Sequence, residues 1–236
     1  HNVSNLNEFG IEIEGSININ VKNVVARSRK VAERLSIGVS HLMKKNKITV
    51  IEGIAKIQNK IADGWQIAVE GETNYLLEAP NILLATGARP REISGMEADG
   101  DKIVTYRDAM IPKKIPKSLL VVGSGAIGIE FASFYNDMGV DVIVVEAMDR
   151  ILNVEDKEIS DIAHKSFEKR GIKIYTSATL ESISKSKNGV TSTIIIGGKK
   201  QKISTEKIVM AIGIIGNTEN LGLEAIGVKI EKGHIV

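Results

Sequence analysis

A glycine-rich segment is the part of this sequence whose residue types and spacing are best suited to chemistry. Gly123, Gly125 and Gly128 form a G-x-G-x-x-G pattern directly after an apolar run over 119–122. In such a pattern the first glycine permits a tight turn, the second lets a pyrophosphate approach the backbone, and the third lets a helix pack closely on the strand. The unpaired N–H groups at the start of that helix attract phosphates. The pattern therefore predicts a dinucleotide site.

A second apolar run, over 140–145, ends in Glu146 one helix later. A carboxylate at this place accepts hydrogen bonds from a free ribose 2′-hydroxyl and repels a 2′-phosphate, so NAD is favoured over NADP. Arg150 is able in principle to receive a phosphate, yet Ala147 and Met148 directly follow the acid. The alternative, an α/β unit whose glycines only shape a turn, remains open at this point.

Composition places the chain among ordinary globular proteins, since 43% of its 236 residues are hydrophobic and 25% are charged. No apolar run approaches the ~18 residues needed to cross a bilayer, so we expect no membrane segment. A net charge of +2 gives no electrostatic case for nucleic acid. With no cysteine and no metal-ligand spacing among the four histidines, we expect no disulfide, no thiol nucleophile and no metal site.

The first part of the chain predicts one long helix and an antiparallel meander. Asn20 is suited to cap a helix that runs to about Lys45, because apolar residues recur there every three or four positions. Gly38 inside this helix costs about 1 kcal/mol relative to alanine, so either a close contact requires it or the helix is locally weak. Three β-rich runs predict the strands of the meander, over 48–57, 65–69 and 75–77.

Residues 81–87 predict a buried strand that ends in Thr86 and Gly87. Ligands lie at such strand ends in open α/β sheets, although a bare turn explains the pair as well unless a nucleotide domain lies beside it. A proline-containing linker over 112–116 follows, which indicates a domain boundary near residue 113.

The second part of the chain predicts a nucleotide-binding α/β domain. After the glycine motif and Glu146 we expect a helix over 157–169, a strand over 172–175, and three short antiparallel strands over 179–183, 190–196 and 201–203. Residues 207–213 then repeat the design of 81–87, an apolar strand that ends in Gly213.

The order of these features resembles the flavin-dependent pyridine nucleotide-disulfide oxidoreductases. The resemblance covers essentially the entire chain, because helix, meander, Thr-Gly strand end, linker, glycine motif and second glycine-ending strand occur in the family's order. Within the family the chain looks most like the dihydrolipoyl dehydrogenase group. The segments that indicate this group or complete the family pattern are 44–47, 150–152 and 217–224.

The resemblance implies a domain plan. A partial FAD-binding domain of helix and β meander covers 1–113, a Rossmann-like NAD-binding domain with a three-stranded antiparallel meander covers 114–213, and residues 214–236 return to the FAD domain. It also implies a cytoplasmic homodimer that serves a lipoyl-dependent 2-oxoacid dehydrogenase complex, with no nucleic-acid partner.

The resemblance also assigns cofactor contacts to individual residues. Glu130 matches a carboxylate beside the flavin and nicotinamide rings, although an acid in the first turn of a helix is also favoured by the helix dipole alone. Thr86 and Gly87 match positions that lie against FAD. The positions that match the NAD site are Gly123, Gly125, Ile127, Gly128, Glu146 and, near the nicotinamide, Gly213.

The chain also departs from the family pattern. It lacks the cysteine pair, the first flavin glycine motif, the later Gly-Asp segment and the His-x-x-x-x-Glu acid-base element, and it begins with His1 rather than Met. Ile214 and Ile215 stand where the family has arginine and a second polar residue, which puts the contacts made there in doubt. We therefore expect an internal, inactive piece of a longer enzyme, with no catalytic residue in this chain.

The function implied for the parent enzyme is oxidation of dihydrolipoamide, with electrons passing through a cysteine pair and FAD to NAD. Two alternatives remain open. One is another reductase of the same superfamily, such as a mercuric or glutathione-type reductase, or an NADH oxidase. The other is an NAD-binding module without chemistry.

Overall fold

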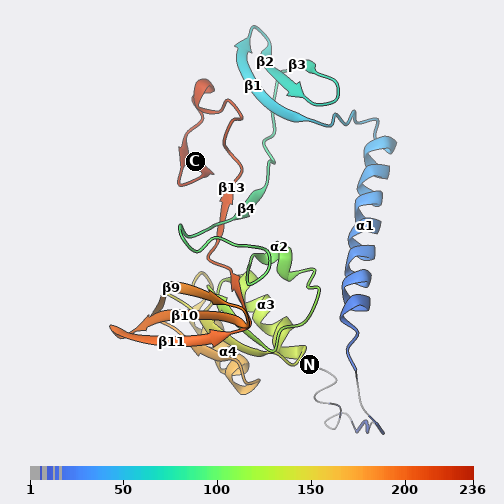
Figure 1. Cartoon of the computed structure of the whole chain (residues 1–236). Coiled ribbons are helices and arrows are strands. Elements are labelled where there is room, and N and C mark those ends of the chain that lie inside the picture. The colour runs from blue at the N-terminus through green and yellow to red at the C-terminus, as the bar shows by residue number, and fades with distance from the viewer. Residues whose placement is uncertain (1–5, 7–9, 13, 16–17) are drawn as a thin grey trace. The chain divides into compact units, whose positions relative to one another are not determined.

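The computed structural model describes residues 6, 10–12, 14–15 and 18–236, which fall into two compact units (Figure 1). One unit holds the described residues up to Arg29 together with Glu92–Gly213, and the other holds Lys30–Arg91 and Ile214–Val236. The long helix α1 (Val21–Lys45) contributes residues to both. The two compact units do not test the predicted boundaries between the FAD-binding and NAD-binding domains. Those boundaries, at residues 113 and 213, stay predictions.

The first unit is built on a five-stranded parallel sheet. Its strands lie in the order β5 (Ile103–Val104), β12 (Lys207–Met210), β6 (Ser118–Val122), β7 (Asp141–Val145) and β8 (Lys173–Tyr175). Every neighbouring pair is parallel. The near-continuous apolar runs of β6 and β7 suit such a sheet, because its strands are covered on both faces. The α/β, Rossmann-like prediction is confirmed.

Alternate residues of β6 pack against different layers. Leu119 and Val121 belong to a core shared with helix α3 (Ala126–Asp137), through Ala132 and Tyr135. Helix α4 (Lys157–Lys169), as predicted from the sequence, packs at the edge of the same core through Phe167. The period of two along a strand places Leu120 and Val122 on the opposite face.

That opposite face is covered by a second sheet, the predicted antiparallel meander. It consists of β9 (Ala178–Ser186), β10 (Gly189–Ile196) and β11 (Lys199–Thr205), which appear as adjacent orange arrows in Figure 1. Val190 and Ile194 of β10 are buried in the same cluster as Leu120 of β6. Complete burial of one such side chain contributes about 1.5–3 kcal/mol, so this contact anchors the meander on the parallel sheet.

The second unit contains the other predicted meander. Its strands are β1 (Ile54–Ile61), β2 (Gly64–Glu70) and β3 (Tyr75–Ala79), paired antiparallel in that order. The first strand begins later than predicted, at residue 54 rather than 48. The reason is that pairing starts with Ile54 opposite Glu70, the last residue of β2, so residues 48–53 have no strand opposite them.

Short elements complete the two units. In the second unit β4 (Ala88–Pro90) pairs with β13 (Ile214–Gly216), and a hairpin joins β14 (Ile230–Glu231) to β15 (His234–Ile235) after the 3-10 turn η2 (Glu224–Ile226). In the first unit the four-residue helix α2 (Tyr106–Ala109) is capped by Thr105.

Helix α1 has the predicted limits and cap, because the Asn20 Oδ1 atom accepts the Asn23 N–H at 3.1 Å. No residue of the helix is buried, and its apolar stripe, including Val31, Leu35 and Val39, is exposed. A side chain added at Gly38 would meet no atom within 4 Å among the described residues. Of the two explanations for this glycine, a close contact therefore has no support among the residues that the structure describes.

The predicted buried strand over 81–87 is wrong. These residues form no strand, β4 begins only at Ala88, and the Leu83 side chain is 92% exposed. A buried strand needs hydrogen-bonding neighbours for its N–H and C=O groups, and no described strand pairs with this segment. Its apolar composition alone does not make it a strand.

The Asp99 carboxylate stabilises the turn that precedes the edge strand β5. One oxygen of Asp99 accepts the backbone N–H groups of Asp101, Lys102 and Ile103 at 2.8–2.9 Å, and the other accepts the Lys185 ammonium at 2.8 Å. Burial acts to raise the pKa of Asp99, but the hydrogen bonds from Lys185 and the backbone outweigh it and hold the pKa below its usual range. The ionised carboxylate therefore stabilises the native turn.

We expect Asp99→Ala to lower the free energy of unfolding by about 1–3 kcal/mol at pH 7, because three backbone donors lose a charged acceptor. Lys185→Ala is the matched control, and loss of this partly exposed ion pair alone should cost only about 0.2–1 kcal/mol. Urea unfolding of the three proteins measures both values. The pKa of Asp99 is lower in the native state than in the unfolded state. The stability difference between wild type and Asp99→Ala should therefore be complete above the unfolded-state pKa of ~3.9 and shrink as the pH falls below it. Equal losses in both variants would contradict this role.

Candidate functional site

The first glycine of the motif sits where strand β6 turns toward helix α3. Gly123 has a φ of +95°, and its N–H donates to the Val145 carbonyl at 2.8 Å. A side chain added there would collide with the backbone carbonyl of Ala211, just beyond β12. Both the left-handed backbone and the close approach require glycine at this position.

The other two glycines meet opposite surroundings. A side chain at Gly128 would collide with the Gly123 carbonyl, so its absence lets α3 lie directly on the turn. A side chain at Gly125 would meet no atom of the described chain within 4 Å. Packing therefore explains Gly123 and Gly128 but not Gly125, whose surroundings leave room for a ligand.

The N-terminus of α3 is open to an anion. Gly125 occupies the cap position and provides no side-chain hydrogen bond, and the first turn contains no acidic residue. The first N–H groups of a helix have no partner within the helix, and they carry the positive end of its dipole. This end of α3 can therefore bind phosphate groups.

The predicted acid lies beside the same turn. Glu146 follows β7 directly and is only 8% exposed. Its Oε2 atom accepts the Ser124 N–H at 2.8 Å and the Ser124 hydroxyl at 2.6 Å, while Oε1 accepts the Met148 N–H at 2.8 Å. The structure thus brings Glu146 against the glycine turn, with both carboxylate oxygens held by the protein.

Ser124 is a site residue that the sequence analysis did not identify. It is 1% exposed, and its carbonyl accepts the Leu152 N–H at 3.0 Å. The available signal was a hydroxyl between the first two glycines of a motif that is followed by an acid. The sequence does not show that this hydroxyl donates to Glu146, and that contact is what makes Ser124 part of the site.

Arg150, the possible phosphate ligand, is engaged in its own loop. One terminal nitrogen donates to the Asn153 carbonyl at 3.0 Å, and the other lies 3.9 Å from the Asp149 carboxylate. These contacts hold the guanidinium among the residues that follow Glu146.

Glu130 and Gly213 occupy less constrained positions. Glu130 is the fifth residue of α3 and is exposed, so its description as a first-turn helix acid is wrong. Gly213 is exposed and has a φ of +109°, directly after the segment that contacts Gly123. Ile127 lies in the first turn of α3 and is half-buried.

Thr86 and Gly87 belong to the other compact unit. The Thr86 hydroxyl donates to the Asn217 carbonyl at 2.7 Å, the Asn217 amide donates to the Thr86 carbonyl at 3.0 Å, and the Asn217 N–H donates to the Gly87 carbonyl at 3.0 Å. Both residues are exposed. Most of their polar groups therefore already have partners in this chain.

A salt bridge supports this crossing of two chain segments. The Arg89 guanidinium donates to both oxygens of Glu219, at 2.5 and 3.0 Å, and also reaches the Gly216 carbonyl at 3.2 Å. Hydrogen bonding from Arg89 lowers the pKa of Glu219 to about 2. The pair is a well-oriented, bidentate contact at an exposed position.

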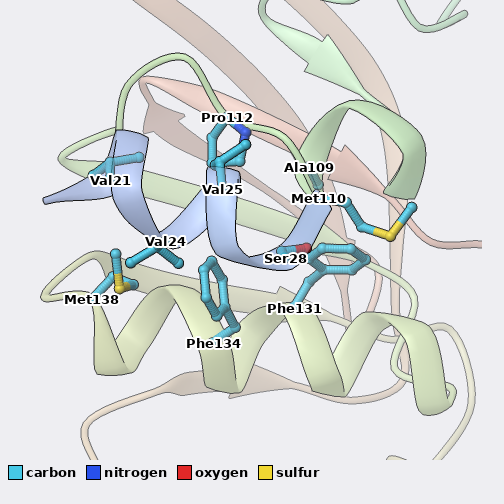
Figure 2. Close-up of a pocket in the computed structure, with 10 residues that line it drawn as sticks. All are labelled: Val21, Val24, Val25, Ser28, Ala109, Met110, Pro112, Phe131, Phe134 and Met138. Atoms are coloured by element: carbon cyan, nitrogen blue, oxygen red, sulfur yellow. The ribbon is translucent and has the colours of Figure 1, made fainter. Parts of the chain in front are cut away.

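A separate apolar cavity lies in the first unit and does not suit a dinucleotide. Figure 2 shows Val24 and Ser28 of α1 facing Phe131 and Phe134 of α3 across it. Its volume is about 200 Å³, below the roughly 300–1,000 Å³ of typical small-molecule sites, and among its described lining residues only Ser28 has a polar side chain.

Two further site classes have no support in the part of the chain that the structure describes. Over these residues, no group of three or more histidine, aspartate or glutamate side chains is arranged to hold a metal ion. No helix there has the length and apolar character to span a bilayer.

Known proteins of one family resemble this chain over nearly its whole length. The family described as pyridine nucleotide-disulphide oxidoreductase matches residues 6–236. Dihydrolipoyl dehydrogenases from Rhizobium etli and Zymomonas mobilis are 48% and 41% identical, over 97% and 100% of this chain. In each case the match covers 50% of the relative, so the chain spans about half the length of these proteins.

Solved structures give the same result. LpdA from Mycobacterium tuberculosis superposes with a TM-score of 0.84 at 29% identity, over 93% of this chain and 48% of that one. A cysteine-to-serine mutant of the HOCl-induced flavoprotein disulfide reductase RclA from Escherichia coli superposes with a TM-score of 0.76 at 25% identity, with the same coverage. The chain therefore belongs to the pyridine nucleotide-disulphide oxidoreductase family, and its sequence groups with the dihydrolipoyl dehydrogenases.

Proposed function

We propose that this chain supplies the NAD-binding part of a dihydrolipoyl dehydrogenase, which oxidises dihydrolipoamide with NAD as the hydride acceptor. The observation that supports it most is the pairing of an uncapped α3 N-terminus at Gly125 with the buried carboxylate of Glu146. The first attracts phosphate and the second accepts hydrogen bonds from a ribose. Together they match the two polar ends of an ADP-ribose unit.

Each residue then has a distinct role. The N–H groups at the start of α3 bind the pyrophosphate, and Gly125 provides the space for it. Glu146 accepts the ribose 2′-hydroxyl, and its negative charge disfavours the 2′-phosphate of NADP. We assign Glu130 and Gly213 to the nicotinamide end on the resemblance to the family, since both are exposed near the carboxyl ends of the parallel strands.

The resemblance to the family implies a flavin as well. FAD would pass electrons between a dithiol and the nicotinamide. In this chain the side chain and carbonyl groups of Thr86 and the carbonyl of Gly87 are already bonded to Asn217, and both residues lie outside any strand. The two residues by themselves do not form a flavin site, and no step of the reaction is assigned to them.

The assembly belongs to the same proposal. We infer a cytoplasmic homodimer that serves a lipoyl-dependent 2-oxoacid dehydrogenase complex, on the resemblance to dihydrolipoyl dehydrogenases. The similarity to RclA supports another flavin-dependent disulfide reductase as the second candidate function.

Substitutions at two glycines of the motif distinguish an effect on ligand binding from an effect on folding. We expect Gly125→Val to reduce NADH affinity by at least about 100-fold while the melting temperature changes little, because the added side chain enters ligand space and not protein. Gly128→Val is the matched control and should destabilise the fold by several kcal/mol, because it collides with the Gly123 backbone. Calorimetric titration and thermal melting measure the two effects. A folded Gly125→Val protein that binds NADH normally would refute the proposed site.

The acid allows cofactor choice to be tested. We expect wild type to bind NADH more tightly than NADPH, and Glu146→Gln to lose about 10–100-fold in NADH affinity, the effect of one charge-assisted hydrogen bond. Removing the charge should also narrow the difference between the two cofactors. Titration of both cofactors into both proteins measures this, with melting curves to confirm that the variant is folded. Unchanged NADH affinity in the variant would remove Glu146 from the site.

The absence of cysteine limits the reactions that this 236-residue chain can catalyse by itself. We expect the purified 236-residue chain to show no dihydrolipoamide:NAD oxidoreductase activity and to retain no FAD, because it contains no cysteine to accept electrons from a dithiol. A protein of verified 25.6 kDa mass is assayed for NADH formation by its absorbance and for bound flavin by its colour. Dihydrolipoamide-dependent NADH formation would show that the chain contains a different catalytic apparatus.

A further inference from the structure

We propose that Ser124 is a positioning residue for the ribose of the dinucleotide. Its hydroxyl, together with two backbone N–H groups, orients the Glu146 carboxylate and leaves Oε1, the oxygen with one protein donor, to receive the 2′-hydroxyl. The inference rests on the NAD-binding function proposed above and adds to it the residue that sets the geometry of the acid.

The contact between the two side chains is short and shielded from water. The Ser124 hydroxyl donates to Glu146 Oε2 at 2.6 Å, and the Ser124 N–H donates to the same oxygen at 2.8 Å. Hydroxyl-to-carboxylate bonds of about 2.5–2.7 Å are charge-assisted and about twice as strong as neutral ones. Because Ser124 is 1% exposed, water cannot easily replace either donor.

The opposite oxygen is held from another direction. Oε1 of Glu146 accepts the Met148 N–H at 2.8 Å. Donors on both oxygens prevent rotation of the carboxylate, since any turn breaks at least one of the three bonds. Hydrogen bonds thus tie the carboxylate of Glu146, which directly follows β7, to the glycine turn.

The hydrogen bonds from the protein occupy the two carboxylate oxygens unequally. Oε2 of Glu146 accepts two hydrogen bonds, from the Ser124 hydroxyl and N–H, and Oε1 accepts one, from the Met148 N–H. Oε1 is therefore the less occupied oxygen, and it is the one we assign to the ligand. A carboxylate oxygen accepts hydrogen bonds, so it suits a ribose hydroxyl and disfavours a 2′-phosphate, which is mostly ionised at neutral pH.

The experiment compares NADH with the analogue that lacks the 2′-hydroxyl on its adenosine ribose. In wild type we expect NADH to bind about tenfold or more tightly than this 2′-deoxy analogue, as one charge-assisted hydrogen bond predicts. In Ser124→Ala the preference should fall to about threefold or less, with the affinity for the analogue nearly unchanged. Ser124→Gly, which also lacks the hydroxyl, should behave in the same way and serves if the alanine variant does not fold.

Ser160→Ala is the matched control. The Ser160 hydroxyl is equally buried and donates to the Leu152 carbonyl at 3.0 Å, in the same loop region but without contact to Glu146. It should lower the melting temperature and leave the NADH preference as in wild type. A Ser124 variant that keeps the wild-type preference, or that weakens both ligands equally, would overturn the positioning role while the NAD site stands. Absence of NADH binding to wild type would instead refute the NAD site itself, and this inference with it.

Discussion

The close approach of backbone to backbone at the glycine turn is the constraint on which the rest of the site depends. Side chains at Gly123 or Gly128 would overlap the carbonyls of Ala211 or Gly123, respectively. Because neither residue has a side chain, α3 begins directly at the ends of β6 and β12. The N-terminus of α3 consequently lies at Gly125, where an added side chain would meet no described atom within 4 Å.

Electrostatics at this turn follow from that placement. The positive end of α3 has no acidic residue in its first turn to neutralise it, and the nearby carboxylate of Glu146 is already held by three donors. A buried carboxylate without such donors would be costly, because burial penalises the charged form. The hydrogen bonds from Ser124 and Met148 supply such donors to Glu146 beside the N-terminus of α3.

The second unit depends on a different kind of contact. Its two chain segments are joined by the short pairing of β4 with β13, the amide contacts of Asn217, and the bidentate ion pair between Arg89 and Glu219. Such exposed contacts contribute little stability individually, while they determine the path of the backbone. Polar pairing rather than apolar burial thus sets the course of residues 86–89.

Features that depend on local chemistry could be predicted from the amino-acid sequence. Glycine spacing predicted the turn, an acid after an apolar run predicted a carboxylate at the strand end, and the periodicity of 157–169 predicted α4 with its observed limits. These predictions succeed because backbone freedom, strand polarity and amphipathicity are properties of neighbouring residues. The surroundings that distinguish Gly125 from Gly123 and Gly128 could be seen only in the three-dimensional structure.

Contacts between residues far apart in the chain became visible only in the folded structure. Ser124 and Glu146 are 22 residues apart, and Arg89 and Glu219 are 130 apart, so no local pattern encodes either contact. The same applies to residues 81–87, whose apolar composition resembles that of 207–213. The second segment contains β12, which has parallel neighbours on both sides, while the first has no strand beside it in the described chain. A strand exists only where another strand satisfies its N–H and C=O groups, and that partner is chosen by the fold as a whole.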